Sequence, residues 1–314
     1  MRGSTQNSKL RTQNYFWPLL IMALGLIALL QALAVFPPAV ADLIGRAWPV
    51  VLVLVGLILI LDQIPLLRRW AAPLGLLVTV GLLAVIIVVA YTTRASTERE
   101  DNVVTVEQII TEEPERLRVT VETIQTRVDI SPVVGEEPAI RAEFVGSTES
   151  EIETDYTLEG DSAVFLLRET RPNPIPALEA IGRGRLNVEL PSGIPIELSF
   201  RNADGTVSLN LLGLNMARLN VNITRGDLLL SLANTPLEER GDVVVTRGDV
   251  TVFVPDGLAV HLFLNRGGSG REPEFPADQY LYLRDDSLQT VDFNDYEART
   301  ELNLTVPGGI IHVE

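Results

Sequence analysis

Two hydrophobic patterns divide the chain. In the first hundred residues, Phe16 to Phe36 and Ala71 to Tyr91 are runs of 21 residues without a charge. A helix needs about 20 apolar residues to cross the hydrocarbon core of a bilayer, so both runs predict membrane spans. After residue 102, apolar and polar residues alternate instead, which is typical of β-strands with one buried face.

A third span is expected between these two. Ala47 to Leu61 supplies only 15 uncharged residues, bracketed by Arg46 and Asp62. We therefore place this span at about residues 44–62, with Arg46 reaching toward the headgroups. The first run is longer than the apolar core of a signal peptide and lacks a small-x-small site, which favours a retained anchor.

The first two spans repeat each other. WPLLIMALGLIALL begins at Trp17 and WPVVLVLVGLILIL begins at Trp48, 31 residues later. A plain hairpin anchor is the simpler interpretation of this repeat. The alternative is a helix-packing surface for another membrane protein, because small residues such as Gly25 and Gly56 allow helices to approach closely.

Basic residues predict the orientation of the spans. Five lie in the polar tail 1–15 and the second loop, and three lie in the first loop and after the third span. This difference favours a cytoplasmic N-terminus. Three spans then place the C-terminal domain outside the cytoplasm. If residues 44–62 do not cross, that domain lies in the cytoplasm.

Residues 92–102 are a charged linker, and residues 103–314 are predicted to form an acidic all-β domain. Leu117, Val119 and Val121 alternate with polar residues. Val128 and Ile130 are expected to follow on a second strand, across a hairpin. No long helical pattern occurs in this part of the chain.

The β-domain also repeats itself. LNVELPSGIPIELSF (186–200) and VTVFVPDGLAVHLFL (250–264) align at an offset of 64 residues, and LNLTVPGGIIHV (302–313) is a shorter third version. Each predicts a strand, a turn containing proline and glycine, and a second strand. Regular strands without crossover helices indicate a β-solenoid or a very regular sheet.

Three Arg-Gly-Asp triplets lie in this domain, centred on Gly226, Gly241 and Gly248. One interpretation is a repeated cell-adhesion signal. The other is architectural, because each triplet precedes an alternating apolar segment at a point where a β-repeat must turn. We favour turns of the fold for all three.

The W-P-x6-G repeats, the R/N-G-D and P-x-G strand repeats and the final VPGGIIHVE together resemble the LiaF-like envelope-stress proteins of bacteria. The C-terminal part is similar to their toast-rack, or adhesin-like, repeat domain. The resemblance extends from about Tyr15 to Glu314. It implies a toast-rack-like β-repeat sheet behind a membrane region, and a membrane sensor histidine kinase as a protein partner.

Charge and composition exclude several functions. The chain has 25 basic and 41 acidic residues, and the part after residue 102 has a net charge of −19. Such a polyanion is repelled by nucleic-acid phosphates, so no nucleic-acid partner is expected. The absence of cysteine excludes disulfides and cysteine-based metal sites.

Few residues carry candidate chemistry. His261 and His312 lack motif partners and are interpreted as surface residues of strands, and Asp285-Asp286 as ordinary surface acids. Residues 266–271 (RGGSGR) lack the lysine of a phosphate-binding loop and predict a solvent loop. Asn222 and Asn303 begin N-x-T sequons that we attribute to chance. No catalytic, cofactor-binding or metal-binding residue is therefore predicted.

The expected function is that of a non-enzymatic multi-pass membrane protein in an envelope-stress response, acting by contact with a kinase or a related membrane protein. Self-association through edge strands of the β-domain is a further expectation. A structural or adhesin-like surface scaffold is the alternative. An enzyme acting on envelope polymers is the least favoured reading.

Overall fold

A computed structural model describes residues 97–111, 114–135, 138–172, 182–267 and 271–314. The predicted tail 1–15 and the spans 16–36, 44–62 and 71–91 lie outside these residues. Within the described part, no helix has the length and apolar character needed to cross a membrane. Residues Thr97–Glu314 form one compact unit.

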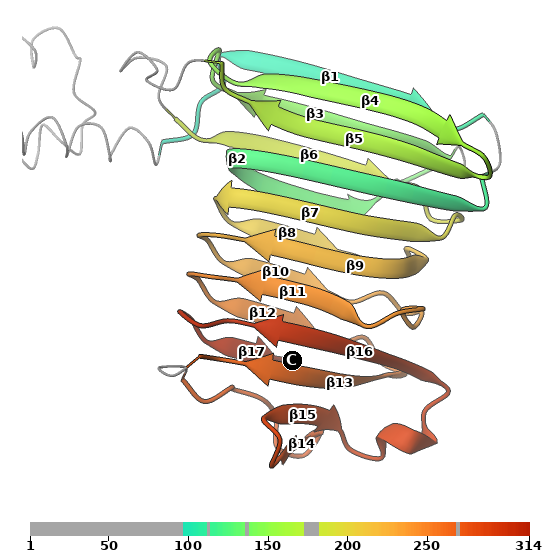
Figure 1. The fold of residues 1–314 in the computed structure, drawn as a ribbon, viewed down its shortest axis with the longest axis vertical. Helices are drawn as coiled ribbons and strands as arrows, with labels where there is room; N and C mark the ends of the chain where they lie inside the picture. The colour runs from blue at the N-terminus through green and yellow to red at the C-terminus, as the bar shows by residue number, and fades with distance from the viewer. Residues whose placement is uncertain (1–96, 112–113, 136–137, 173–181, 268–270) are drawn as a thin grey trace, which may run out of the picture. The chain divides into compact units, whose positions relative to one another are not determined.

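The described part is built from β-strands and one short 3-10 helix, η1 (Figure 1). In chain order the elements are β1 (Asn102–Ile109), β2 (Arg116–Pro132), β3 (Ala139–Gly146), β4 (Glu151–Glu159), β5 (Ser162–Thr170), β6 (Gly184–Leu190), β7 (Ile196–Asp204), β8 (Val207–Asn210), β9 (Met216–Ile223), β10 (Leu228–Ser231), β11 (Gly241–Val245), β12 (Val250–Phe253), β13 (Leu258–Asn265), β14 (Tyr280–Leu283), β15 (Ser287–Thr290), η1 (Phe293–Asp295), β16 (Ala298–Thr305) and β17 (Ile311–Val313).

The strands form two facing sheets that share β2. The first sheet has the order β1-β3-β6-β2-β8-β10-β12-β17. The second has the order β4-β5-β2-β7-β9-β11-β16-β13-β15-β14. The middle of the domain is a parallel coil, in which the chain runs along the second sheet, turns a corner and returns along the first (Figure 1). The all-β prediction is confirmed, and the coil agrees with the predicted repeat sheet.

The core lies between the two sheets. Alternate residues of the coil strands point inward, and Val221, Leu230, Val243 and Val252 have no exposed surface. The period-2 pattern arises because successive side chains of a strand point to opposite faces, and only the inner face is removed from water.

The hairpin predicted between Val121 and Val128 is wrong. Strand β2 runs without a break through both residues. Its first half pairs with β5 and β7 in the second sheet, and its second half pairs with β6 and β8 in the first. The apolar phase changes because the strand passes from one sheet to the other, so a different set of side chains faces the core.

The first two sequence repeats are equivalent in the structure, but the third is not. The turns containing Gly193 and Gly257 both lead from the first sheet to the second, at positions where an added Cβ would meet nothing within 4 Å. The turn containing Gly309 leads from the second sheet to the first, at the opposite corner, where backbone packs closely. Similar strand-turn-strand sequences therefore serve two different corners.

The C-terminal end of the domain is covered by its own chain. Glu274 N–H donates to the carbonyl oxygen of Ile311 (2.8 Å), and Val313 N–H donates to that of Glu274 (2.9 Å), which adds a short bridge beside β17. Strands β15 and β14 extend the second sheet at the same end. Tyr280 is buried there, and burial raises the pKa of its hydroxyl to about 12.

Candidate functional site at the Arg-Gly-Asp corner

Four glycines stack on one another where the coil turns from the second sheet to the first. A Cβ added to Gly226 would lie 2.0 Å from the carbonyl oxygen of Gly205, and one on Gly248 would lie 2.1 Å from that of Gly226. For Gly309 the distance to the carbonyl oxygen of Gly248 is 1.8 Å. We call Gly205, Gly226, Gly248 and Gly309 the glycine column. Only glycine allows the backbones of successive coils to approach so closely.

Two members of the glycine column are the central residues of Arg-Gly-Asp triplets. Gly226 has φ +127° and Gly248 has φ +143°, conformations that side chains strongly disfavour. The turns also exchange backbone bonds, since Gly226 N–H donates to the carbonyl oxygen of Arg247 at 2.9 Å. The architectural interpretation of these two triplets therefore has a physical basis in both φ and packing.

The aspartates of the same triplets hold the coils together. Asp227 Oδ1 accepts the N–H of Asp249 (2.9 Å), and Asp249 Oδ1 accepts the N–H of Ile310 (2.8 Å). Each carboxylate thus binds the backbone of the next coil at the glycine column. The arginine of the first triplet, Arg225, lies 3.4 Å from the carboxylate of Asp204.

The third triplet does not lie in a turn, contrary to the sequence prediction. Gly241 is the first residue of β11, is buried and has no positive φ. A Cβ at this position would lie 2.5 Å from Cδ2 of Leu302 on the neighbouring strand β16. Here glycine is needed for side-chain packing between strands, so three identical triplets occupy two kinds of position.

We expect the arginine and the aspartate of the triplet centred on Gly248 to differ in their contribution to stability. Asp249→Ala should lower the free energy of unfolding by about 1–2 kcal/mol, because it removes the acceptor of the Ile310 N–H. Arg247→Ala should change it by less than about 0.5 kcal/mol, because the side chain is exposed. Thermal unfolding followed by circular dichroism checks both. Equal losses for the two variants would contradict the architectural role of the aspartate.

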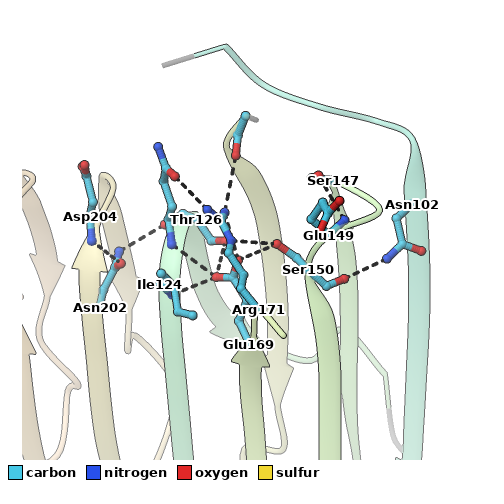
Figure 2. A network of polar contacts seen from close by, with 12 residues as sticks. Asn102, Ile124, Thr126, Ser147, Glu149, Ser150, Glu169, Arg171, Asn202 and Asp204 are labelled. Atoms are coloured by element: carbon cyan, nitrogen blue, oxygen red, sulfur yellow. Dashed lines mark hydrogen bonds and ion pairs between the residues drawn. The ribbon is translucent and has the colours of Figure 1, made fainter. Parts of the chain in front are cut away.

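A buried carboxylate secures the bend of β2 next to this corner (Figure 2). The side chain of Glu169, near the end of β5, has no exposed surface. Its Oε2 accepts from the N–H of Ile124 (2.8 Å) and from Oγ1 of Thr126 (2.7 Å), and its Oε1 accepts from Oγ of Ser150 (2.9 Å). The guanidinium of Arg171 lies 3.4 Å from Oε1.

Glu169 replaces a missing ladder partner. Strand β5 pairs with β2 only as far as Glu122, opposite Arg168. Beyond this point β2 has lost β5 but still pairs with β7 as far as Gln125. Backbone N–H groups on the β5 side without a partner would be costly. The carboxylate binds these groups in place of a strand.

Asn202 connects the Glu169 network to the glycine column. It is 2% exposed, and its Nδ2 donates to the carbonyl oxygens of Thr126 (3.1 Å) and Gly205 (3.3 Å). Its Oδ1 accepts the N–H of Asp204 (3.1 Å). Figure 2 shows Asn202 and Asp204 on the strand beside the bend of β2.

Glu169 was not predicted from the sequence, although a signal was present. Ala163, Phe165 and Leu167 are the inward residues of β5, and Glu169 continues the same alternation. A charged residue at an inward position of a strand has to be hydrogen-bonded or paired. That pattern alone would have made Glu169 a candidate for a buried structural role.

Half of the chain matches a known protein family. The family model for the N-terminal domain of toast_rack, DUF2154, matches residues 95–251, which is half of the chain. The chain belongs to this family. The toast-rack part of the sequence resemblance is thereby confirmed, whereas the LiaF-type membrane region stays a prediction.

A solved structure shares the fold of this toast-rack domain. A "putative cell adhesion protein" from Clostridium sporogenes is 16% identical, covering 68% of this chain and 99% of its own, with a TM-score of 0.58. A match to a "putative adhesin" from Bacteroides fragilis covers 68% of this chain and 98% of that chain at 8% identity, with a TM-score of only 0.23. No curated protein matches the chain significantly.

His261 of the toast-rack domain lies in a polar chain on β13. Its Nε2 is 3.0 Å from Oγ of Ser287, which donates its proton to Oδ1 of Asp285 (2.7 Å). Nε2 must therefore be the donor to Ser287, which is buried. The centroid of the imidazole ring lies 4.1 Å from the ring centroid of Phe263 and 5.9 Å from that of Phe293. When the histidine donates to the serine and the serine donates to the aspartate, the histidine cannot take the serine proton and so cannot activate the serine as a nucleophile.

The remaining sequence candidates also contact neighbouring parts of the toast-rack domain. His312 Nδ1 is 3.1 Å from Oε2 of Glu274, within the C-terminal bridge. Arg266 donates to Asp286 (2.7 Å) and to the hydroxyl of Tyr282 (2.8 Å). The hydrogen bond between Tyr282 and Asp286 raises the pKa of the tyrosine and lowers the pKa of the carboxyl, and Arg266 lowers the latter further. Residues 268–270 of the predicted loop lie outside the described residues.

The sequon asparagines lie within strands. Asn222 is on β9, and Asn303 is on β16, where its Nδ2 donates to Oδ1 of Asp242 (2.7 Å). Positions within strands differ from the exposed loops typical of glycosylation acceptors. Across the described ranges, no group of three or more histidine and carboxylate side chains is arranged to hold a metal ion.

Proposed function

We propose that the protein is a non-enzymatic scaffold of the bacterial cell envelope, which acts by protein-protein contact and is anchored in the membrane by residues 16–91. The observation that carries the proposal is that buried and turn-forming polar side chains bind groups within the domain itself. Glu169, Asp227, Asp249 and Ser287 all bind groups of their own domain. These side chains serve to hold the strands and turns of the domain in place.

The outer face of the second sheet supports a role in contact. Glu122 binds Arg168 (2.7 Å) and Arg201 (3.2 Å) across neighbouring strands, and Glu197 binds Arg116 (2.7 Å). The bond from Arg116 lowers the pKa of Glu197. Each exposed pair contributes no more than about 1 kcal/mol, but together they set a regular pattern of charge on a regular surface. Such a surface suits recognition by another protein.

Regulation of a membrane sensor kinase is the finer form of this proposal. It rests on the resemblance to LiaF-like proteins, in which the membrane helices would contact the kinase. The toast-rack domain would then report the state of the envelope. A cytoplasmic N-terminus and three spans would expose the domain to that environment.

Deleting the gene, or only the codons for residues 97–314, tests the regulatory form. We expect both deletions to change kinase-dependent transcription in cells treated with a cell-wall antibiotic. Protease treatment of intact cells should also degrade the toast-rack domain. If the full deletion leaves this transcription unchanged, the regulatory form is wrong.

An adhesin-like surface scaffold is the second candidate. The observation in its favour is the fold shared with the Clostridium sporogenes protein, over nearly the whole length of that chain. The same deletion strains separate the two candidates. Loss of cell attachment with unchanged transcription would favour the surface scaffold. If neither attachment nor transcription changed, both the regulatory form and the adhesin-like scaffold would be wrong.

A further inference from the structure

Two edge strands meet at the N-terminal end of the domain, and they differ in character. Strand β1 ends the first sheet and β4 ends the second, at the same end of the domain (Figure 1). Among the described strands, β1 pairs only with β3, and β4 pairs only with β5. An edge strand presents a row of backbone donors and acceptors that can pair with another chain.

Strand β4 is protected against such pairing. Glu151, Glu153, Asp155 and Glu159 are all exposed on its outer face. In an antiparallel pair of two β4 strands centred on Asp155, two aspartates would face each other and Glu151 would face Glu159. Like charges opposite each other destabilise a strand pair, and charged edges are a common defence against association.

Strand β1 has no such protection. Its eight residues, NVVTVEQI, include one charged residue, Glu107, which is already paired with Arg141 at 3.0 Å. Val103 is 60% exposed and Ile109 is 50% exposed, both on the outer face. A long edge strand rich in β-branched residues, with exposed apolar side chains and little charge, is suited to strand addition.

We propose that β1 is a dimerisation edge, which pairs antiparallel with β1 of a second copy of this chain. The sequence of β1 is self-complementary in one register. With Val106 opposite Val106 of the second copy, Val103 faces Ile109 of that copy, and Thr105 faces Glu107. This register buries both exposed apolar residues, keeps the two glutamates apart and leaves both Glu107–Arg141 pairs intact.

The opposite end of the domain explains why assembly stops at two copies. At that end, β17 has only three residues and is bridged by Glu274, and β14 has only four residues. Short or covered edges are poor templates for pairing. Using β1 in both copies gives a two-fold contact that closes on itself.

The acidic β4 strands predict how the dimer responds to salt. The two-fold axis that joins the β1 strands also brings the β4 strands of both copies toward each other, because both edges lie at the same end. Their repulsion is weakened by salt. The dimer fraction should therefore rise when NaCl increases from about 50 to about 500 mM, over which the screening length shortens severalfold. A fall in the dimer fraction would contradict this arrangement.

Charge substitutions test the register in the full chain in detergent. Val103→Lys with Ile109→Lys places lysine opposite lysine twice in each dimer, and should raise the dissociation constant by roughly tenfold. Val103→Lys with Ile109→Glu places opposite charges in the same positions and should restore dimerisation. Sedimentation measures the association, and circular dichroism checks that both variants fold. Equal association of the two variants would overturn the proposed pairing.

Cysteine crosslinking supplies a second test, because the chain contains no cysteine. Directly opposed residues of an antiparallel pair have Cα atoms about 4.5–5.5 Å apart, within disulfide range. In membranes, Val103→Cys with Ile109→Cys should give disulfide-linked dimers, whereas either substitution alone should not. The matched control on β4, Glu153→Cys with Thr157→Cys, should give none. Crosslinking on β4 but not on β1 would refute the proposal.

This inference and the proposed function can fail separately. Dimerisation through β1 requires no kinase and no attachment partner, and its tests measure only association between copies. An unchanged transcriptional response would therefore leave the dimer standing. A monomeric chain under all conditions would leave the scaffold function standing.

Discussion

Replacing Gly248 with alanine is expected to lower the free energy of unfolding of the toast-rack domain by roughly 3–5 kcal/mol. Two costs combine at this position. The residue has φ +143°, and the new Cβ would lie 2.1 Å from the carbonyl oxygen of Gly226. That oxygen belongs to the backbone and cannot rotate away, so the coils must separate. Chemical or thermal unfolding followed by the β-sheet signal in circular dichroism measures the loss.

Two other glycines separate the contributions to this effect. Gly257 has φ +86° but open space around it, so alanine there should cost about 1 kcal/mol from backbone strain alone. Gly193 has neither a positive φ nor a neighbour within 4 Å. Alanine at Gly193 should be neutral or slightly stabilising, by up to about 1 kcal/mol. If all three substitutions had the same effect, the glycine column would have no special role.

Replacing Glu169 with alanine is expected to cost about 3 kcal/mol or more, since a buried carboxylate with several donors is removed. Ile124 N–H, Thr126 Oγ1 and Ser150 Oγ would all lose their acceptor. The bend of β2 would lose the group that holds it between the sheets. Urea unfolding monitored by circular dichroism gives the change in free energy.

The matched control for Glu169 is an exposed glutamate on the adjacent strand. Glu153→Ala on β4 should change the stability by less than about 0.5 kcal/mol. Glu169→Gln should have an intermediate effect, because the amide keeps one acceptor oxygen but turns an NH2 group toward donors. A Glu169→Ala variant as stable as the Glu153→Ala control would show that the network adds nothing to stability.

The fold class could be predicted because it depends on local patterns. Alternation in β5, for example, places Phe165 and Leu167 in the core, and both are buried. The Pro-x-Gly turns at Gly193 and Gly257 also lie between strands. The hairpin expected before Val128 was wrong, because a change of apolar phase has the same appearance in a hairpin and in a strand that changes sheets.

The candidate site was harder to predict from the sequence than the fold class. The architectural role of the triplets at Gly226 and Gly248 agrees with the structure, but Gly241 shares their sequence and lies in a strand. A triplet does not reveal which neighbour it will meet. The alternation of β5 marks Glu169 as a buried charge, but its donors come from β2 and the turn before β4, which are distant along the chain, so the sequence does not show what it binds.

By itself, the sequence determined which residues of each strand face the core, since period-2 alternation is a property of neighbouring residues in one strand. The tertiary structure alone decided how the corners are built. The glycine column joins residues 21, 22 and 61 positions apart, at 205, 226, 248 and 309. Its requirement for glycine comes from a carbonyl oxygen of another coil. That oxygen takes its place only when the coils stack, so no local pattern can encode it.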